Sequence, residues 1–175
     1  MMQSQWWTDA AIYHIYPLGF CGAPHNNDPN GPVESRLKSI TEALPAIAEM
    51  GFTALYLGPL FESSSHGYDT ADYARVDRRL GDNADLRELV EHAHRLGVRI
   101  VLDGVFNHVG RDFWAFRDVV QKGRESDHTG WFQGIDFSRN NRFDDGLVYE
   151  GWEGTDSLVA LNLENEAVRS YLLER

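Results

Sequence analysis

Residues 52–60 read FTALYLGPL and residues 98–105 read VRIVLDGV. Each run is short, almost wholly apolar and preceded by a glycine, which is typical of a strand buried on both faces. Between the two runs, apolar side chains recur every three or four residues over 86–96, the spacing of an amphipathic helix whose N-cap is Asp82 or Asn83. A strand, a helix and a second strand in this order predict a βαβ unit with parallel strands and a right-handed crossover.

The same alternation extends toward the N-terminus. The run 10–20 is rich in Ile, Tyr and Phe and predicts a first strand. Apolar side chains at helical spacing over 37–50 predict a first helix, with Pro45 requiring either a kink or a helix that starts a turn earlier. A polar loop is expected from about residue 61 to residue 81. The chain is therefore predicted to be an α/β protein with two βαβ units.

The regular pattern stops after Asn107. Residues 110–157 are rich in Asp, Asn, Arg, Gly and aromatic side chains without a period, and such long insertions are usually functional or form a subdomain. An extended segment over 158–163 and a helix from near Asn165 are expected to follow. Three tryptophans in this part of the chain could form a carbohydrate platform, although such residues more often make a core: Trp114, Trp131 and Trp152.

The composition excludes several classes of protein. The 175 residues are 42% hydrophobic, enough for a packed core, and carry 16 basic against 27 acidic residues, a formal charge of −11. An acidic chain without a basic block does not favour a nucleic-acid or anionic-membrane partner. No apolar run approaches the roughly 18 residues of a transmembrane helix. The single cysteine, Cys21, and a start without signal-peptide features lead us to expect a cytoplasmic protein.

Polar motifs follow the second and third predicted strands. Residues 65–73 read SHGYDTADY and residues 103–108 read DGVFNH. In parallel α/β folds, ligands bind where the loops converge at the carboxyl ends of the strands. These two segments are therefore the expected site.

The motifs HGYDTADY and DGVFNH, at this separation, resemble the α-amylase family of glycoside hydrolases. The resemblance covers almost the whole chain, from about residue 10 to residue 175. Two further segments are similar to that family: GFTALYLGPL at 51–60 and LVALNLEN at 158–165. Two others are most similar to its neopullulanase and cyclomaltodextrinase members: WFQGIDF at 131–137 and YEGWEG at 149–154.

The resemblance implies the N-terminal portion of a (β/α)₈ TIM barrel with an irregular domain inserted after strand three. Residues 1–109 would form the first three βα units, residues 110–160 the inserted subdomain, and residues 161–175 the return to the barrel. A complete barrel of this kind needs about 250 residues.

The resemblance also implies roles for three residues. Tyr68 would stack its ring on the sugar at the cleaved bond, Asp69 would accept hydrogen bonds from hydroxyls of that sugar, and His108 would donate a hydrogen bond to them. Each has a structural alternative. Tyr68 could be a core tyrosine, Asp69 a turn-forming or N-capping residue, and His108 a buried histidine satisfied by the protein.

Other strand-end residues are expected to organise loops or bind an ion. Asp103 is interpreted as a loop-organising or arginine-pairing residue. Asn107 matches a position that binds calcium in some family members, and the turn at Asn27 and Asp28 resembles an ion-binding loop, although turn chemistry explains it equally well. His92 and His94 lie two residues apart and do not share a helix face. We expect no required cofactor, with calcium as an option.

The catalytic carboxylates of the resembled family have no counterpart here. Retaining glycosidases use two carboxylates about 5–5.5 Å apart, and in this family they follow the fourth and fifth strands. No segment matches those motifs, so no catalytic residue is assigned to this chain.

We expect the N-terminal part of a retaining hydrolase for α-linked glucose oligosaccharides, active only with a C-terminal half from the same gene product or a separate chain. A non-catalytic saccharide-binding module and a purely structural interaction subunit are the alternatives. Linkage and chain-length preference, hydrolysis against transglycosylation, and oligomeric state stay open.

Overall fold

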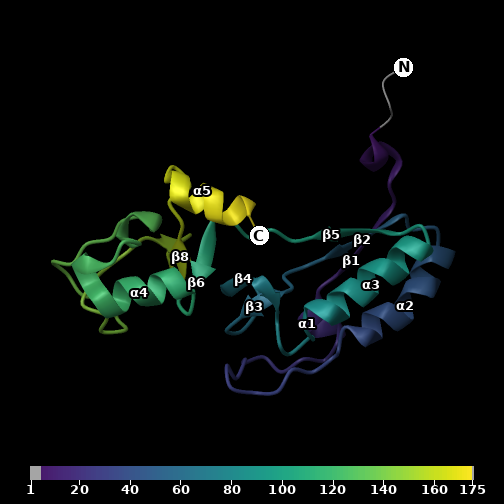
Figure 1. The fold of residues 1–175 in the computed structure, drawn as a ribbon, viewed down its shortest axis with the longest axis horizontal. Coiled ribbons are helices and arrows are strands. Elements are labelled where there is room, and N and C mark those ends of the chain that lie inside the picture. The colour runs from purple at the N-terminus through teal and green to yellow at the C-terminus, as the bar shows by residue number, and fades with distance from the viewer. Residues whose placement is uncertain (1–4, 175) are drawn as a thin grey trace. The chain divides into compact units, whose positions relative to one another are not determined.

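The computed structural model describes residues 5–174 and divides into two compact units (Figure 1). The first holds the segments up to His25, Asn30–Leu60 and Val76–Gly104, and the second holds Asn26–Pro29, Phe61–Arg75 and the segment from Val105 onward. The boundaries expected at residues 109 and 160 divide the barrel from the inserted subdomain, which is a different division from that into compact units. These boundaries stay a prediction.

The first unit is built on a three-stranded parallel sheet in the order β1-β2-β5. Its strands are β1 (Ile12–Ile15), β2 (Ala54–Leu57) and β5 (Arg99–Leu102). The register places Ile15 beside Leu57 and Leu57 beside Leu102. The predicted parallel pairing of all three strands is confirmed.

Two helices pack against each other beside this sheet (Figure 1). Helix α2 (Lys38–Glu49) continues through Pro45, and α3 (Asn83–Arg95) begins after the N-cap Asp82. The Asp82 carboxylate accepts from the backbone of Asp85, whose side chain accepts from the Asp82 N–H, a reciprocal capping box. The buried apolar side chains of this unit include Ile15, Leu37, Ile40, Leu44, Leu55, Leu57, Leu80, Leu89 and Ala93.

Three local expectations are wrong in this part of the chain. The segment 10–20 is strand only over β1, because Pro17 starts a helical turn, α1 (Pro17–Phe20), after η1 (Trp6–Asp9) and β1. The segment 61–81 is not all loop, since β3 (Phe61–Ser63) pairs with β4 (Thr70–Val76). Strand β5 is not buried on both faces: it forms an edge of its sheet, and Leu102 is 39% exposed.

The second unit contains a three-stranded antiparallel sheet in the order β6-β8-β7. Its strands are β6 (His108–Gly110), β7 (Gly151–Trp152) and β8 (Thr155–Ala160). The other elements of the unit are α4 (Trp114–Lys122), η2 (Gly123–Glu125), η3 (Thr129–Trp131) and α5 (Glu166–Leu173). The helix expected from near Asn165 is confirmed, because Asn165 caps α5 through its side chain.

The inserted segment has more regular structure than its sequence indicates. Phe113, Phe116 and Phe132 are buried together with Val119 and Leu161, and their rings meet edge to face. Such aromatic contacts add about 0.5–1.5 kcal/mol each to the burial of apolar area. Packing between residues distant in sequence therefore stabilises α4, which a search for periodicity does not detect. Within residues 5–174, no helix is long and apolar enough to cross a bilayer.

A buried ion pair ties the loop before α3 to the rest of the first unit. Asp77 and Arg79 are 1% and 3% exposed, and their side chains form a two-point contact, Nε to Oδ1 at 2.8 Å and Nη2 to Oδ2 at 2.6 Å. Arg79 Nη1 also donates to the carbonyls of Pro24 and His25, at 3.0 and 2.7 Å. The guanidinium thus satisfies three separate acceptor groups in a site shielded from water.

We predict that Arg79→Met lowers the free energy of unfolding by about 3–5 kcal/mol, because it removes the guanidinium that neutralises a buried carboxylate and donates to two carbonyls. Urea denaturation of the intact protein measures this change. Arg87→Met, at an exposed position of α3, is the control and should change stability by less than about 0.5 kcal/mol. Equal effects of the two substitutions would contradict a structural role for the pair.

Candidate functional site

The structure gathers most of the predicted site residues in the second unit. Tyr68 and Asp69 precede β4, Asn107 precedes β6 and His108 opens it. Asp103 lies in the first unit, directly after β5, where its N–H donates to the carbonyl of Leu57 at 3.0 Å. The sugar-binding candidates therefore belong to one compact unit and Asp103 belongs to the other.

His108 is a buried residue whose two ring nitrogens both have protein partners. It is 5% exposed. Nε2 lies 2.9 Å from the carbonyl oxygen of Tyr68, and because a carbonyl only accepts, Nε2 carries the proton. Nδ1 lies 2.8 Å from the side-chain nitrogen of Asn107 and accepts from it. The neutral Nε2–H tautomer satisfies both contacts.

The surroundings of His108 favour its neutral form. Burial is the main cause that lowers the pKa of His108 below 6.5, while its hydrogen bond to the Tyr68 carbonyl and the Asp69 charge act in the opposite direction. The Trp152 ring stacks on the imidazole with centroids 5.7 Å apart and planes 26° apart. His108 thus fits the alternative of a buried histidine satisfied by the protein, and direct donation to a sugar stays a prediction.

Tyr68 presents its side chain to solvent from a fixed backbone. It is 41% exposed, which does not fit the alternative of a core tyrosine. Its N–H donates to Nδ1 of His66 at 3.2 Å, and its carbonyl accepts from His108. The ring lies 6.1 Å from that of His66. The residue therefore combines a restrained main chain with an accessible aromatic ring.

The carboxylate of Asp69 holds the turn that carries Tyr68. Asp69 is 6% exposed, and its Oδ2 accepts from Ser65 Oγ at 2.7 Å. Its Oδ1 accepts from the N–H of Gly67 at 3.2 Å and lies 3.7 Å from Nδ1 of His66. Gly67 has φ of 92°, a conformation that side chains disfavour. The geometry supports the turn-forming alternative, and the sugar contact of Asp69 stays a prediction.

Strand β6 approaches the turn closely enough to require glycine at position 110. A Cβ on Gly110 would lie 2.4 Å from the carbonyl oxygen of Asp69 and 2.8 Å from its carbon. The buried Tyr73 adds a further restraint, since its hydroxyl donates to the carbonyls of Val105 and, at 3.2 Å, His108. Burial raises the pKa of the Tyr73 hydroxyl well above its ordinary value, so it stays a donor.

Two residues near the site were not singled out as site residues from the sequence. His66 belongs to the same HGYD motif and contacts both Tyr68 and Asp69, so its motif position was the available signal. Trp152 was considered only with the other tryptophans, and nothing in its sequence context indicated that it would stack on His108.

The other two tryptophans contribute to packing. Trp131 is 9% exposed and lies in the aromatic core. Trp114 is 43% exposed, but its Nε1 donates to Tyr171 Oη at 3.1 Å and its ring meets those of Trp131 and His128 edge to face. The core interpretation therefore holds for Trp131 and in part for Trp114.

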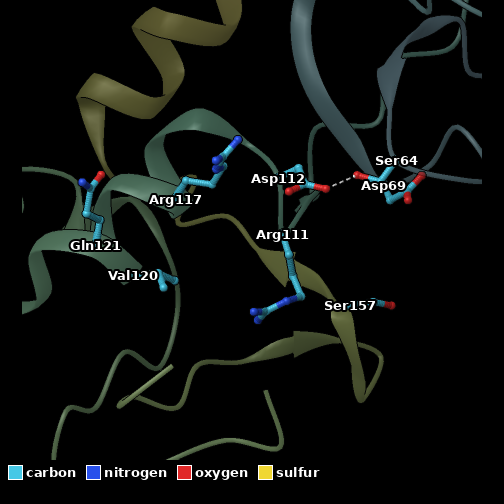
Figure 2. Close-up of a pocket in the computed structure, with 8 residues that line it drawn as sticks. All are labelled: Ser64, Asp69, Arg111, Asp112, Arg117, Val120, Gln121 and Ser157. Atoms are coloured by element: carbon cyan, nitrogen blue, oxygen red, sulfur yellow. Dashed lines mark hydrogen bonds between the residues drawn. The ribbon is translucent and has the colours of Figure 1, made fainter. Parts of the chain in front are cut away.

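A cavity of about 640 Å³ lies in the same unit and reaches Asp69 (Figure 2). Arg117, Val120 and Gln121 extend from α4 at one side, and Ser64 and Asp69 lie at the other (Figure 2). Asp112 accepts from Ser64 Oγ at 2.7 Å. The lining residues are Ser64, Asp69, Arg111, Asp112, Arg117, Val120, Gln121 and Ser157.

The calcium candidates do not assemble into a complete site. Among residues 5–174, no group of three or more His, Cys, Asp or Glu side chains is placed to hold a metal ion. Asn27 donates to the Ser63 carbonyl at 2.7 Å and to Glu62 at 3.3 Å, and its buried Oδ1 has no hydrogen-bond partner among the described residues. One such oxygen falls short of the six to eight that calcium takes. Calcium at Asn27, Asp28 or Asn107 stays a prediction, and no chemical step is assigned to it.

Comparison with known proteins shows the family of the chain. Residues 14–174 match the family described as alpha amylase, catalytic domain. The chain is 39% identical to neopullulanase 2 of Thermoactinomyces vulgaris and 33% identical to a cyclomaltodextrinase of Thermoanaerobacter pseudethanolicus, each alignment covering 97% of this chain and 32% of the relative. The chain thus spans about a third of the length of these curated relatives.

Solved structures give the same result. The debranching enzyme from Nostoc punctiforme matches with a TM-score of 0.82 and 32% identity, over 99% of this chain and 40% of that one. The cyclic α-maltosyl-(1→6)-maltose hydrolase from Arthrobacter globiformis matches with a TM-score of 0.79 and 32% identity, over 97% and 41%. The chain therefore belongs to the α-amylase catalytic domain family and has the fold of an N-terminal portion of its TIM barrel.

Proposed function

We propose that this chain supplies the sugar-binding wall of a retaining hydrolase for α-linked glucose oligosaccharides. The observation that carries the proposal is the exposed ring of Tyr68 on a main chain fixed by His108. The similarity to a neopullulanase and a cyclomaltodextrinase supports glucose oligosaccharides as the substrate class.

The Tyr68 ring suits the C–H face of a pyranose, because a flat aromatic surface covers apolar area without demanding a hydrogen bond. Holding the backbone on both sides of the ring lowers the ordering cost when a sugar binds. His108 then acts as a positioning residue through the Tyr68 carbonyl. Asp69 keeps further acceptor capacity beyond its two local donors and lines the cavity, so a sugar hydroxyl can share its carboxylate.

The cleavage chemistry needs two carboxylates about 5–5.5 Å apart. One attacks the anomeric carbon and forms a covalent glycosyl-enzyme intermediate, while the other protonates the departing glycosidic oxygen. Water or another sugar, deprotonated by the second carboxylate, then attacks this intermediate and releases the glycosyl group from the enzyme. We assign both carboxylates to a C-terminal half of the barrel, encoded with this chain or separately. Residues of this chain bind and orient the sugar at the cleaved bond.

The sheet of the first unit supports the involvement of further strands. Strand β5 is an edge of that sheet, with Leu102 39% exposed, and Ile12 on the opposite edge strand is 50% exposed. Unpaired strand edges with apolar side chains favour pairing with additional strands.

The intracellular maltogenic amylase of Bacillus subtilis, 33% identical, supports a cytoplasmic location.

We predict that residues 1–175 alone do not hydrolyse a labelled malto-oligosaccharide and that activity appears when the C-terminal half is added. Release of labelled product measures this, with the C-terminal half alone as the control. Turnover by the isolated chain would contradict the assignment of the carboxylates. Saccharide affinity without turnover in every mixture would favour a non-catalytic binding module.

We predict that Tyr68→Ala lowers kcat/KM of the complete enzyme by about fivefold, because stacking by an aromatic ring contributes on the order of 1 kcal/mol. Tyr68→Phe keeps the ring and should stay within about threefold of the native enzyme. Steady-state kinetics on maltotriose and urea denaturation of both variants check this. If Tyr68→Ala unfolds the protein, the ring belongs to the core and the proposal for Tyr68 is wrong.

We predict that His108 makes the stability of the protein dependent on pH below about 6.5. Burial lowers the pKa of His108 in the folded state, so the unfolded chain binds the proton more readily and the free energy of unfolding falls as pH decreases through that range. Protonation also places a proton on Nδ1, facing the amide donor of Asn107.

His108→Gln keeps a donor for the Tyr68 carbonyl but removes the titrating ring. Its free energy of unfolding should fall less steeply between pH 7 and pH 5 than that of the native protein, as measured by urea denaturation at several pH values. His94→Gln, at an exposed position of α3, is the control. A native slope that persists in His108→Gln and disappears in His94→Gln would contradict the assignment.

A further inference from the structure

Tyr73 has a buried hydroxyl group to which the proposed function gives no role. The residue lies on β4 and is 4% exposed. Its hydroxyl donates to the main-chain carbonyls of Val105 and, at 3.2 Å, His108. A hydroxyl has a single proton, so the two carbonyls share it. Both acceptors lie in the DGVFNH motif, and the hydroxyl therefore connects that motif to the HGYDTADY motif.

Packing alone does not require this hydroxyl. The ring of Tyr73 lies among aromatic neighbours, with its centroid 5.8 Å from that of Phe106 and 6.1 Å from those of Phe61 and Phe113. A phenylalanine would make the same ring contacts. The hydroxyl is also hydrogen-bonded to the side chain of Thr70, which is 2% exposed. Two buried hydroxyls that bond to each other and to the main chain form a satisfied polar network, and such a network fixes the backbone that it binds.

His108 is attached to the HGYDTADY motif at two points. Its carbonyl accepts from the hydroxyl of Tyr73, and its Nε2 donates to the carbonyl of Tyr68 at 2.9 Å. Tyr68 and Tyr73 belong to one continuous segment, so the main chain and the imidazole of His108 are both held against that segment. The Tyr73 hydroxyl therefore determines how far the imidazole lies from the Tyr68 carbonyl.

The bond to Val105 restrains the chain on the other side of Asn107. The carbonyls of Val105 and His108 are three residues apart in sequence and accept from one hydroxyl. The segment between them contains Asn107, whose side-chain nitrogen donates to Nδ1 of His108 at 2.8 Å. The hydroxyl of Tyr73 thus holds the main chain on both sides of the residue that satisfies the second imidazole nitrogen.

We propose that Tyr73 is a positioning residue for the sugar site: its hydroxyl holds the main chain of His108, and through His108 it sets the placement of the Tyr68 ring. The inference rests on the proposed function, because the ring is the group proposed to contact the sugar. Tyr73 is too deeply buried to reach a sugar itself. Loss of its hydroxyl should therefore weaken sugar binding through Tyr68 and leave the bond-breaking step unchanged.

Tyr73→Phe in the complete enzyme tests this inference, because it removes the hydroxyl and keeps the ring. We expect kcat/KM for maltotriose to fall about threefold, mainly through KM, since a less restrained ring loses more entropy when a sugar binds. Tyr149→Phe is the matched control and should stay within about 1.5-fold of the native enzyme. The Tyr149 hydroxyl lies in the same unit but is bonded to Arg111 and to the carbonyl of Asp156.

Thr70→Val is a second variant of the same network. It removes the hydroxyl that bonds to Tyr73 and keeps the branched shape of the side chain. Its effect on kcat/KM should have the same direction as that of Tyr73→Phe, and it carries the test if Tyr73→Phe does not fold. Urea denaturation of each variant shows whether the kinetics are measured on folded enzyme.

A double-mutant cycle separates positioning from a general effect on the fold. In the Tyr68→Ala background, Tyr73→Phe should change kcat/KM by less than about 1.5-fold, because the ring that it positions is absent. A residue that only stabilises the fold would have the same effect in both backgrounds.

Three results would overturn the inference. The first is native kcat/KM in folded Tyr73→Phe. The second is a loss of kcat/KM that persists in the Tyr68→Ala background or that Tyr149→Phe reproduces. The third is failure of both Tyr73→Phe and Thr70→Val to fold, which would make the network purely structural. The single variant Tyr68→Ala tests the proposed function separately: if it loses activity, any of these results contradicts only the role of Tyr73.

Discussion

The hydrogen bond from His108 Nε2 to the Tyr68 carbonyl connects the two sequence motifs of the site. The two residues are 40 positions apart. The hydrogen bond of 2.9 Å fixes the main chain of the HGYDTADY motif to His108, the residue that ends the DGVFNH motif and begins β6. Two further contacts restrain the same region. Gly110 must lack a side chain because its Cβ would lie 2.4 Å from the Asp69 carbonyl oxygen, and the Tyr73 hydroxyl donates to the His108 carbonyl. All three contacts restrain the segment around the turn that carries Tyr68.

This arrangement divides the motif residues into a frame and a contact surface. His108 and Asp69 are 5% and 6% exposed, and their polar atoms bind the protein, whereas Tyr68 is 41% exposed. A sugar site gains from such a division, because a ring on a restrained backbone loses little entropy on binding. Under the proposed function, His108 and Asp69 therefore act mainly by positioning the ring of Tyr68. Trp152 extends the frame by covering the face of the His108 ring.

The sequence predicted those parts of the structure that depend on local patterns. Apolar runs located β2 and β5, helical spacing located α2 and α3, and Asp82 was among the expected caps. Elements that depend on distant partners were missed: β3 and β4 exist because they pair, and α4 is stabilised by aromatic rings such as Phe116 and Phe132. The site followed the same rule. Motif position made Tyr68, Asp69 and His108 the predicted site residues, and their roles toward a sugar stay predictions. The acceptor for Nε2, the donors to Asp69 and the stacking of Trp152 arise only from folding.

Asp69 occupies the one place where the frame and the cavity meet. Its carboxylate cannot turn toward a ligand freely, because Ser65 and Gly67 hold one oxygen each. A carboxylate fixed in this way still has lone pairs to offer, and their directions are set before a sugar arrives. A substrate hydroxyl that bonds to Asp69 must therefore adopt the orientation that the turn dictates, and the same turn sets the position of Tyr68. The Tyr68 ring and the Asp69 carboxylate are thus positioned by a single local structure, as the proposed sugar site requires.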